Sequence, residues 1–458
     1  MSTRRLLADR RARRYLAAQT LSLVGDSAML LACGIWVKEL TGSDGAAGLT
    51  FLFLTLPALL APLAGLLADR VRRGRLLVAA NLAGAVVLSP LLAVRGPDQV
   101  WLIYAVMLLY GCLGLVIAPA QSALLVTLLP EDLLADANGL LRTVRESLWL
   151  LAPLAGAGLY ALLGGAAVAM LDMATFLGAV ALLLSLRLVE PVPERRARDG
   201  GALRHWLGEA GAGFRHLGRH PLLRRVVLAS AVLALVLGFS ESTGYAVVDR
   251  GLGRSPEFLG VLQAAQGLGA VLGGLASAAA VRRFGEVRVA AVGFLCLAAG
   301  TGLGATEVLG VVLLGRVSTG AGLTVMVIAL LTLLQRTTPA DVQGRVYAGF
   351  EVTTSVPQTV SIGVGAYLIG MLDYRVLLLT QAAVVVLAAL LLVRADRLTE
   401  PTVAARASGN RAAAGPAGTT GPAAEVPVPC RPGHDGDHDH RAGAGARRPT
   451  GAAPSARP

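Results

Sequence analysis

Residues 65–75 read Gly-Leu-Leu-Ala-Asp-Arg-Val-Arg-Arg-Gly-Arg, a short and strongly charged stretch between two long apolar runs. A tight basic turn between two membrane helices fixes their orientation, because arginines are retained on the cytoplasmic side of a membrane. A similar but weaker pattern runs from Gly274 to Gly285, with Arg282 and Arg283 near its end. It also lies between two apolar runs. A basic loop that recurs at about half the chain length predicts a duplicated transporter.

The composition predicts a helical membrane protein. The chain has 458 residues, of which 55% are hydrophobic and only 15% charged, and its mean hydropathy is +0.64. Apolar runs of about 20 residues follow one another, which is long enough for a helix to cross a bilayer. They lack the alternation of barrel strands, and only helices and closed barrels satisfy their backbone groups in lipid. We therefore expect an all-α protein that crosses the cell membrane several times.

The formal net charge of +12 follows the predicted topology. Lys38 is the only lysine, and the other basic residues are arginines that fall in alternate loops. The loops predicted to be inside hold Arg4, Arg5, Arg10, Arg11, Arg13, Arg14, the arginines of 70–75, the linker arginines from Arg187 to Arg225, Arg282, Arg283, Arg288, Arg336 and Arg345. The loops predicted to be outside hold Lys38, Arg95, Arg250, Arg254 and Arg375. This asymmetry predicts that both termini are cytoplasmic, and it argues against a nucleic-acid partner.

Twelve membrane spans are predicted, in two halves. They cover residues 16–38, 46–68, 75–95, 99–121, 139–162, 165–187, 223–247, 257–280, 287–305, 308–334, 347–371 and 374–394. The N-terminal half is 1–187, a basic linker covers 188–222, the C-terminal half is 223–398, and a disordered cytoplasmic tail covers 399–458. Within the linker, the amphipathic stretch 206–215 is expected to lie on the inner membrane surface.

The two halves repeat. Pro130-Glu-Asp132 corresponds to Pro339-Ala-Asp341, an offset of 209 residues, and Ala79-Ala80 corresponds to Ala290-Ala291, an offset of 211. Two six-helix halves that arose by duplication are typical of transporters that rock around a site near the middle of the membrane.

No cofactor or metal is expected. Cys33, Cys112 and Cys296 lie in apolar spans, and no paired spacing indicates a disulfide or a metal site. His434 and the nearby histidines of the tail could hold a divalent cation loosely, but we expect a solvated polar tail. The chain has no phosphate-binding loop, which excludes an ATP-driven pump within it.

The charged loop and several local motifs resemble the major facilitator superfamily over residues 10–398. Residues 22–26, 137–139 and 339–346 are similar to one branch of it, the twelve-helix exporters related to macrolide-efflux and enterobactin-export proteins. The resemblance implies twelve helices in two pseudo-symmetric six-helix halves and a small-molecule substrate. It also implies a cytoplasmic gate in the loop between spans 2 and 3, formed by Gly65, Asp69, Arg70 and Arg73.

The chain departs from the family pattern in two spans. Residues 152–158 resemble the drug-antiporter motif of span 5, but its Gly-Pro and Gly-Gly pairs are broken. In span 4 the family's arginine, four residues before Gly111, is replaced by Met107. Arg316 stands 209 residues later, four residues before Gly320, on the repeat-related helix. The usual proton coupling through span 4 is therefore not expected.

Ionisable side chains deep in a span are costly, at about 2.5–3.5 kcal/mol on insertion scales, so each needs a reason. Asp26 in span 1 and Glu241 in span 7 are 215 residues apart, and we expect them to face one central cavity, where they take up protons or meet a cationic substrate. Arg316 could pair with Glu241, bind a substrate anion or neutralise a buried acid. In the alternative reading, neighbouring groups simply hold the two acids: Ser27, Ser240, Ser242 or helix breaks at Gly25 and Gly238.

Further polar residues are candidates for the gate or the cavity. Arg142 and Glu146 stand one turn apart at the start of span 5, where gate pairing is favoured over substrate contact, and Arg345 is placed with them. Asp172 and Glu351 are expected to be packing or gate acids. The candidates for polar groups of the cavity are Tyr104, Tyr110, Tyr245, Gln263, Gln266 and Gln358. Glutamines also join membrane helices to one another, which is the alternative reading for the last three.

Together these features predict a monomeric secondary transporter without enzyme activity. It would export a small hydrophobic or amphipathic compound, such as a drug, an antibiotic or a siderophore-like molecule, in exchange for protons by alternating access. Two alternatives stay open. One is uptake or facilitated diffusion of a metabolite by the same fold, and the other is a membrane sensor or assembly partner that does not transport.

Overall fold

The computed structural model describes residue 6 and residues 8–60, 72–186, 221–338 and 343–413. Several predictions lie outside these residues: the loop positions Gly65, Asp69 and Arg70, residues 188–220 of the predicted linker, and the tail from residue 414 onward. The side chains of Glu146 and Arg345 lie outside the description as well.

In the described part of the chain before residue 187, six helical segments form what we call the N-terminal set. They are α2 (Arg10–Thr41), α3 (Asp44–Thr55) with the 3-10 turn η1 (Leu56–Leu60), α5 (Arg73–Leu88) with η2 (Ser89–Ala93), α6 (Val100–Leu128) preceded by η3 (Pro97–Gln99), α7 (Glu131–Leu163) and α8 (Gly165–Ser185).

Six more helices follow the linker and form the C-terminal set. They are α10 (Pro221–Ala246) with the π-helical turn η4 (Val247–Gly251), α11 (Leu259–Phe284) preceded by η5 (Pro256–Phe258), α12 (Glu286–Leu303), α13 (Leu309–Thr337), α14 (Gln343–Leu368) and α15 (Tyr374–Ala413).

The predicted spans coincide with these helices where both are described, and the described residues contain no strand. Nine of the described helices are long and apolar enough to cross a membrane. In α7 the apolar part is limited to Leu151–Leu163, and α3 with its 3-10 turn is apolar over Asp44–Leu59. The number of twelve spans therefore stays a prediction.

The last helix runs further than the sequence suggested. Although the tail is expected to begin at residue 399, α15 ends only at Ala413, through a stretch rich in the good helix formers Ala and Arg. Residues from Val403 onward form a separate unit, whose described part is the helical end of α15.

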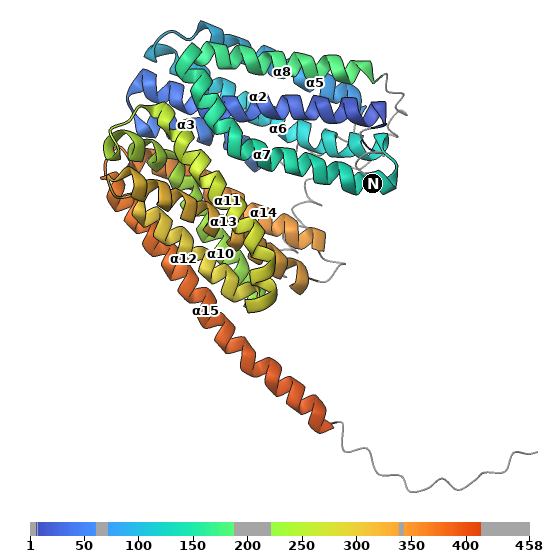
Figure 1. The fold of residues 1–458 in the computed structure, drawn as a ribbon, viewed down its shortest axis with the longest axis vertical. Coiled ribbons are helices and arrows are strands. Elements are labelled where there is room, and N and C mark those ends of the chain that lie inside the picture. Colours follow the sequence, from blue (N-terminus) through green and yellow to red (C-terminus); the bar gives the residue numbers. More distant parts are fainter. Residues whose placement is uncertain (1–5, 7, 61–71, 187–220, 339–342, 414–458) are drawn as a thin grey trace, which may run out of the picture. The chain divides into compact units, whose positions relative to one another are not determined.

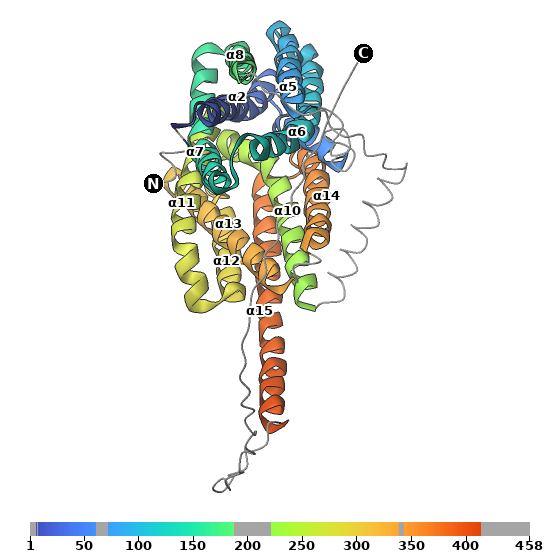
Figure 2. The same ribbon diagram turned by 90° about the vertical axis from the view of Figure 1, so that its right-hand side faces the viewer.

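The helices alternate in direction, so the bundle has two sides. The basic side carries the ends of helices that hold Arg10–Arg14, Arg73, Arg282, Arg283 and Arg336. The far side carries the opposite ends, including the turn between α2 and α3 and the turn η4. Figures 1 and 2 show the N-terminal set as the blue to green helices and the C-terminal set as the yellow-green to red ones.

Buried apolar side chains connect the two sets at the far side. One cluster joins Ile35 and Val37 of α2 to Val247 and Val248 of η4 and to Ile369 after α14. At the basic side the clusters stay within one set: Leu16, Leu77 and Leu124 belong to the first. Leu223, Val227, Leu334 and Val346 belong to the second. The structure is thus closed at the far side.

Candidate functional site

Two carboxylates and a phenol meet in the N-terminal set. The Tyr110 hydroxyl of α6 donates a hydrogen bond to Asp26 Oδ1 of α2 and lies 3.1 Å from Asp172 Oδ2 of α8. Thr175 Oγ1 lies 3.2 Å from Asp172 Oδ1, and Ser22 Oγ lies 3.5 Å from Asp26 Oδ2. Asp172 is fully buried, whereas Asp26 is half-buried and is therefore the accessible member of the pair.

A glycine brings the two acidic helices together. Gly25 directly precedes Asp26, and a Cβ at this position would overlap Asp172 Oδ1 and Thr175 Oγ1. Only a residue without a side chain lets α2 and α8 approach so closely. Packing also orients the phenol, since the rings of Tyr110 and Phe176 lie 6.0 Å apart in a tilted arrangement.

The number of protons held by Asp26, Tyr110 and Asp172 decides which of their contacts are hydrogen bonds. A phenol carries one proton, so Tyr110 can donate to only one carboxylate at a time. With both acids ionised, the second contact, between Tyr110 and Asp172, would join two acceptors. One additional proton on the pair turns both contacts into hydrogen bonds. We call Asp26, Tyr110 and Asp172 the carboxylate pair with its phenol. Their hydrogen bonds are complete when the two carboxylates together hold one proton.

The C-terminal set holds its deep acid differently. Arg316 of α13 donates towards Gln266 Oε1 of α11 at 3.5 Å. Its guanidinium lies 3.8 Å from the position that a Cβ on Gly244 of α10 would occupy. Glu241 is one turn earlier on the same face of α10, so an acid and a cation of the same set lie near each other, although the described residues show no direct ion pair between them.

The serines that might have held the acids bind elsewhere. Ser27 donates to the carbonyl of Leu23, and Ser240 donates to the carbonyl of Val236. Ser242 is fully buried, and its hydroxyl has no partner in the described part of the chain. Both α2 and α10 run unbroken through Gly25 and Gly238, so no helix break serves the acids.

The remaining cavity candidates have different surroundings. Tyr104 donates to the carbonyl of Ala46 at 2.9 Å, and its ring stacks on Phe53 at 4.9 Å. Tyr245 is 1% exposed, and its hydroxyl has no partner among the described residues. Gln263 and Gln358 are half-buried on α11 and α14. Of the six candidates, Tyr110 contacts the carboxylates of Asp26 and Asp172, and Gln266 contacts the guanidinium of Arg316.

The predicted gate is described only in part. Arg73 donates to the carbonyl of Ala123 at 3.2 Å and to Thr127 Oγ1 at 3.0 Å, which ties the start of α5 to the basic end of α6. Arg142 is exposed on α7. The other gate positions lie outside the described residues or side chains, so the gate stays a prediction.

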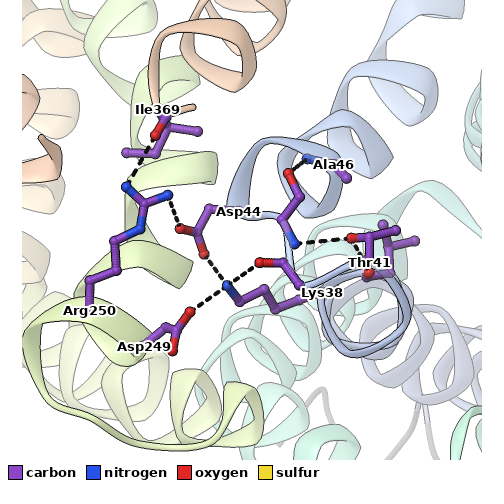
Figure 3. A network of polar contacts seen from close by, with 10 residues as sticks. Lys38, Thr41, Asp44, Ala46, Asp249, Arg250 and Ile369 are labelled. Carbon is purple, nitrogen blue, oxygen red and sulfur yellow. Dashed lines mark hydrogen bonds and ion pairs between the residues drawn. The ribbon is translucent and has the colours of Figure 1, made fainter. Parts of the chain in front are cut away.

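Sequence reasoning missed a group of charges at the far side (Figure 3). Lys38 Nζ lies 2.8 Å from Asp44 Oδ1 and 2.6 Å from Asp249 Oδ2, and Arg250 lies 2.8 Å from Asp44 Oδ2. We call these four residues the far-side ion cluster. Lys38 and Arg250 had been counted only as loop charges. Their partners could have been suspected from the repeat, because Lys38 and Asp249 are 211 residues apart.

Comparison with known proteins agrees with this architecture. The model of the Major Facilitator Superfamily matches residues 15–251 and 234–433. The chain belongs to this superfamily. It is therefore a multi-pass membrane protein with the fold of a transporter, as its apolar helices also indicate.

A curated relative from Bacillus subtilis (strain 168) is the uncharacterized MFS-type transporter YfiS. It is 26% identical over 363 residues, which cover 77% of this chain and 85% of the relative.

Solved structures share the fold at low sequence identity. The nucleoside transporter NupG matches with a TM-score of 0.68 and 15% identity, over 84% of this chain and 99% of its own. A bacterial homologue of the iron transporter ferroportin is 17% identical in both of its states. Its inward-facing state matches with a TM-score of 0.66 over 84% of this chain and 98% of its own. Its outward-facing state matches with a TM-score of 0.55 over 85% of this chain and 100% of its own.

Proposed function

We propose that this superfamily member is a secondary active transporter that exports a small amphipathic compound bearing a cationic group, in exchange for protons. The observation that carries the proposal is the carboxylate pair with its phenol, Asp26, Tyr110 and Asp172. In the described part of the chain, neither carboxylate of the pair forms an ion pair with a basic side chain. The pair can therefore be neutralised by a proton or by a cation brought from outside.

The exchange follows from the hydrogen-bond count. With one proton on the pair, Tyr110 makes hydrogen bonds to both acids, and the site offers little attraction to a cation. When the proton leaves, two carboxylates face each other, and a cationic group of the cargo can replace the lost charge. Asp26 is the member that keeps accessible surface, so it would meet the cargo, while the buried Asp172 and Tyr110 complete the site.

Glu241 and Arg316 have a different part in this scheme. Glu241 and Arg316 have opposite charges and lie near each other in the same set, so together they are formally neutral without a charge from the cargo. We infer that they orient the polar end of the cargo or stabilise the C-terminal set, and that the exchange belongs to the N-terminal set.

The direction of transport rests on topology and resemblance. The positive-inside rule assigns the basic side to the cytoplasm, so a structure closed at the far side is inward-facing. A better match to the inward-facing than to the outward-facing state of the ferroportin homologue supports this assignment. Cargo would then enter from the cytoplasm, in line with the resemblance of residues 22–26, 137–139 and 339–346 to exporters.

Everted membrane vesicles test the proposal, with ethidium, a lipophilic fluorescent cation, as the cargo. We expect wild-type vesicles to accumulate ethidium when an inward-acid proton gradient is imposed and to lose this accumulation when the gradient is collapsed. Asp26→Asn and Asp172→Asn should abolish the response to the gradient. Accumulation that is independent of the gradient would indicate facilitated diffusion instead. An unchanged gradient response in both variants would sink the proposed exchange.

A further inference from the structure

The far-side ion cluster connects the two sets of helices (Figure 3). Lys38 is in the last turn of α2, and Asp44 is the first residue of α3, both in the N-terminal set. Asp249 and Arg250 are in the turn η4 that follows α10, in the C-terminal set. The contacts Lys38–Asp249 and Arg250–Asp44 therefore both cross between the sets.

One contact of the cluster joins equivalent positions of the two predicted repeats. Lys38 and Asp249 are 211 residues apart, the same offset that relates Ala79 to Ala290. Glu39 and Arg250 are also 211 residues apart, so the pair Lys-Glu in one repeat stands where Asp-Arg stands in the other. Of these two pairs, Lys38 and Asp249 form an ion pair, whereas Glu39 accepts a hydrogen bond from Tyr160 and Arg250 pairs with Asp44.

Two turns of the backbone position the charged residues of the far-side ion cluster. Gly42 ends α2 in the left-handed conformation, with φ 67°, and Ser43 then caps α3, so Lys38 and Asp44 face each other across a very short turn. On the other side, α10 ends in a π-helical turn, a form that is rare and often marks functional sites. That turn lets the adjacent residues Asp249 and Arg250 both reach the N-terminal set.

The two central charges are buried and doubly held. Asp44 is 1% exposed and contacts both Lys38 and Arg250, while Lys38 is 5% exposed and contacts both Asp44 and Asp249. Lys38 also donates to the carbonyl of Gly42 at 3.0 Å. Removing one partner of such a group leaves a buried charge without compensation, which favours the state in which water reaches it.

Two polar groups in the interface beside the far-side ion cluster lack hydrogen bonds in the described part of the chain. Ser242 and Tyr245 of α10 press against Gly48 of α3 and Gly34 of α2, where a Cβ would overlap their hydroxyl oxygens. Both hydroxyls are buried and have no hydrogen-bond partner in the described residues. Water would satisfy them if the sets separated here, so these groups favour opening while the ion cluster favours closure.

We propose that Lys38, Asp44, Asp249 and Arg250 form a reversible gate that closes the far side of the transporter. Lys38 is its central member, because it bridges an acid of each set. The gate opens when the contacts between Lys38 and Asp249 and between Arg250 and Asp44 separate, which frees the hydroxyls of Ser242 and Tyr245. The proposal rests only on the alternating-access part of the proposed function, and it requires neither protons nor a particular cargo.

A native cysteine reports directly on this gate. Cys33 of α2 is fully buried in the same apolar cluster as Tyr245 and Val248. In a background in which the other cysteines, Cys112, Cys296 and Cys430, are replaced by serine, the rate of its alkylation by N-ethylmaleimide measures opening. The reaction is followed on the whole chain in native membranes without cargo.

We expect Lys38→Met to accelerate the alkylation of Cys33 by about fivefold or more, the range of ordinary conformational coupling. Lys38→Arg should keep the slow rate, because it keeps the charge. The matched control is Arg375→Met, which breaks another far-side ion pair, with Glu307, that lies within the C-terminal set. It should leave the rate unchanged.

A second variant keeps the test decisive if Lys38→Met does not accumulate in the membrane. Asp249 is 50% exposed, so Asp249→Asn removes a cross-set contact at little cost to folding, and it should also accelerate alkylation. Unchanged rates in the Lys38 and Asp249 variants, or equal acceleration by Arg375→Met, would overturn the gate. Because the assay uses no gradient and no ethidium, it can fail while the proton exchange stands, and the converse also holds.

Discussion

In the N-terminal set two acids share one phenol, whereas in the C-terminal set one acid has an arginine near it. Asp26 and Asp172 meet at Tyr110, and Glu241 lies one turn before Gly244, beside which Arg316 is placed. Asp26 and Glu241 are 215 residues apart, which is close to the offset of the predicted repeat. Met107 stands where the other repeat has Arg316, and it is an apolar residue buried in the core. Among the described residues, the N-terminal set therefore places two acids together without an arginine, whereas the C-terminal set places an arginine near its acid.

The largest effect is expected when one of the two acids of the N-terminal set is removed. Asp26→Asn and Asp172→Asn replace an acid by an amide that cannot exchange a proton. We expect each to weaken ethidium binding about 10- to 100-fold, because a contact to a charged group is worth about 1.5–3 kcal/mol. Fluorescence titration of the purified protein measures this affinity. Glu307→Gln, a far-side acid paired within the C-terminal set, is the control and should bind normally.

The second prediction contrasts charge removal in the two sets. Glu241→Gln or Arg316→Gln alone should each lower the free energy of unfolding by about 1–3 kcal/mol, because the remaining charge loses its partner. The double variant should recover part of the loss, since neither charge is left alone. Chemical denaturation in detergent micelles provides the values. Strictly additive losses would contradict the pairing of Glu241 with Arg316.

The third prediction concerns the close approach of α2 and α8. Gly25→Ala places a methyl group against Asp172 and Thr175, and we expect it to cost about 1–3 kcal/mol of unfolding free energy and to impair transport. Gly158→Ala, on α7, is the matched control because a Cβ there meets open space, so a change within about 0.5 kcal/mol is expected. If both variants behaved alike, the contact at Gly25 would not position the pair.

The last prediction compares two tyrosines of the same helix, and the smallest effect of all is expected at Tyr104. Tyr104→Phe removes a neutral hydrogen bond to a carbonyl and should cost about 0.5–1.5 kcal/mol, with proton-driven transport retained. Tyr110→Phe removes the hydroxyl between the two acids and should abolish the response to the gradient. Vesicle transport of ethidium compares the two, and a retained response in Tyr110→Phe would show that the phenol is not needed.

Much of the fold could be predicted from hydropathy. Where the chain is described, the predicted ranges coincide with helices because long apolar runs in lipid have few alternatives to helix. The repeat offset also placed Asp26 and Glu241 at related positions. The partnership of Asp172 with Tyr110 could not be predicted, because it depends on which faces of α2, α6 and α8 point at one another. That choice comes from packing, including the close contact at Gly25.

The far-side ion cluster escaped prediction for a different reason. The positive-inside rule counts basic residues on each side of a membrane and says nothing of their partners. Lys38 and Arg250 therefore looked like stray outside charges. The short turn at Gly42 and the π-helical turn after α10 decide their contacts, and neither turn is visible in the hydropathy of the chain.

The central claim, that the N-terminal set exchanges a proton for a cationic cargo, is tested most directly by counting protons during binding. Calorimetric titration of the purified protein with ethidium, in buffers of different ionisation enthalpy, measures the number of protons released per bound cation. We expect about one proton from the wild type, where the carboxylate pair carries one, and none from Asp26→Asn or Asp172→Asn. Release of no proton by the wild type, or undiminished release by both variants, would contradict the account.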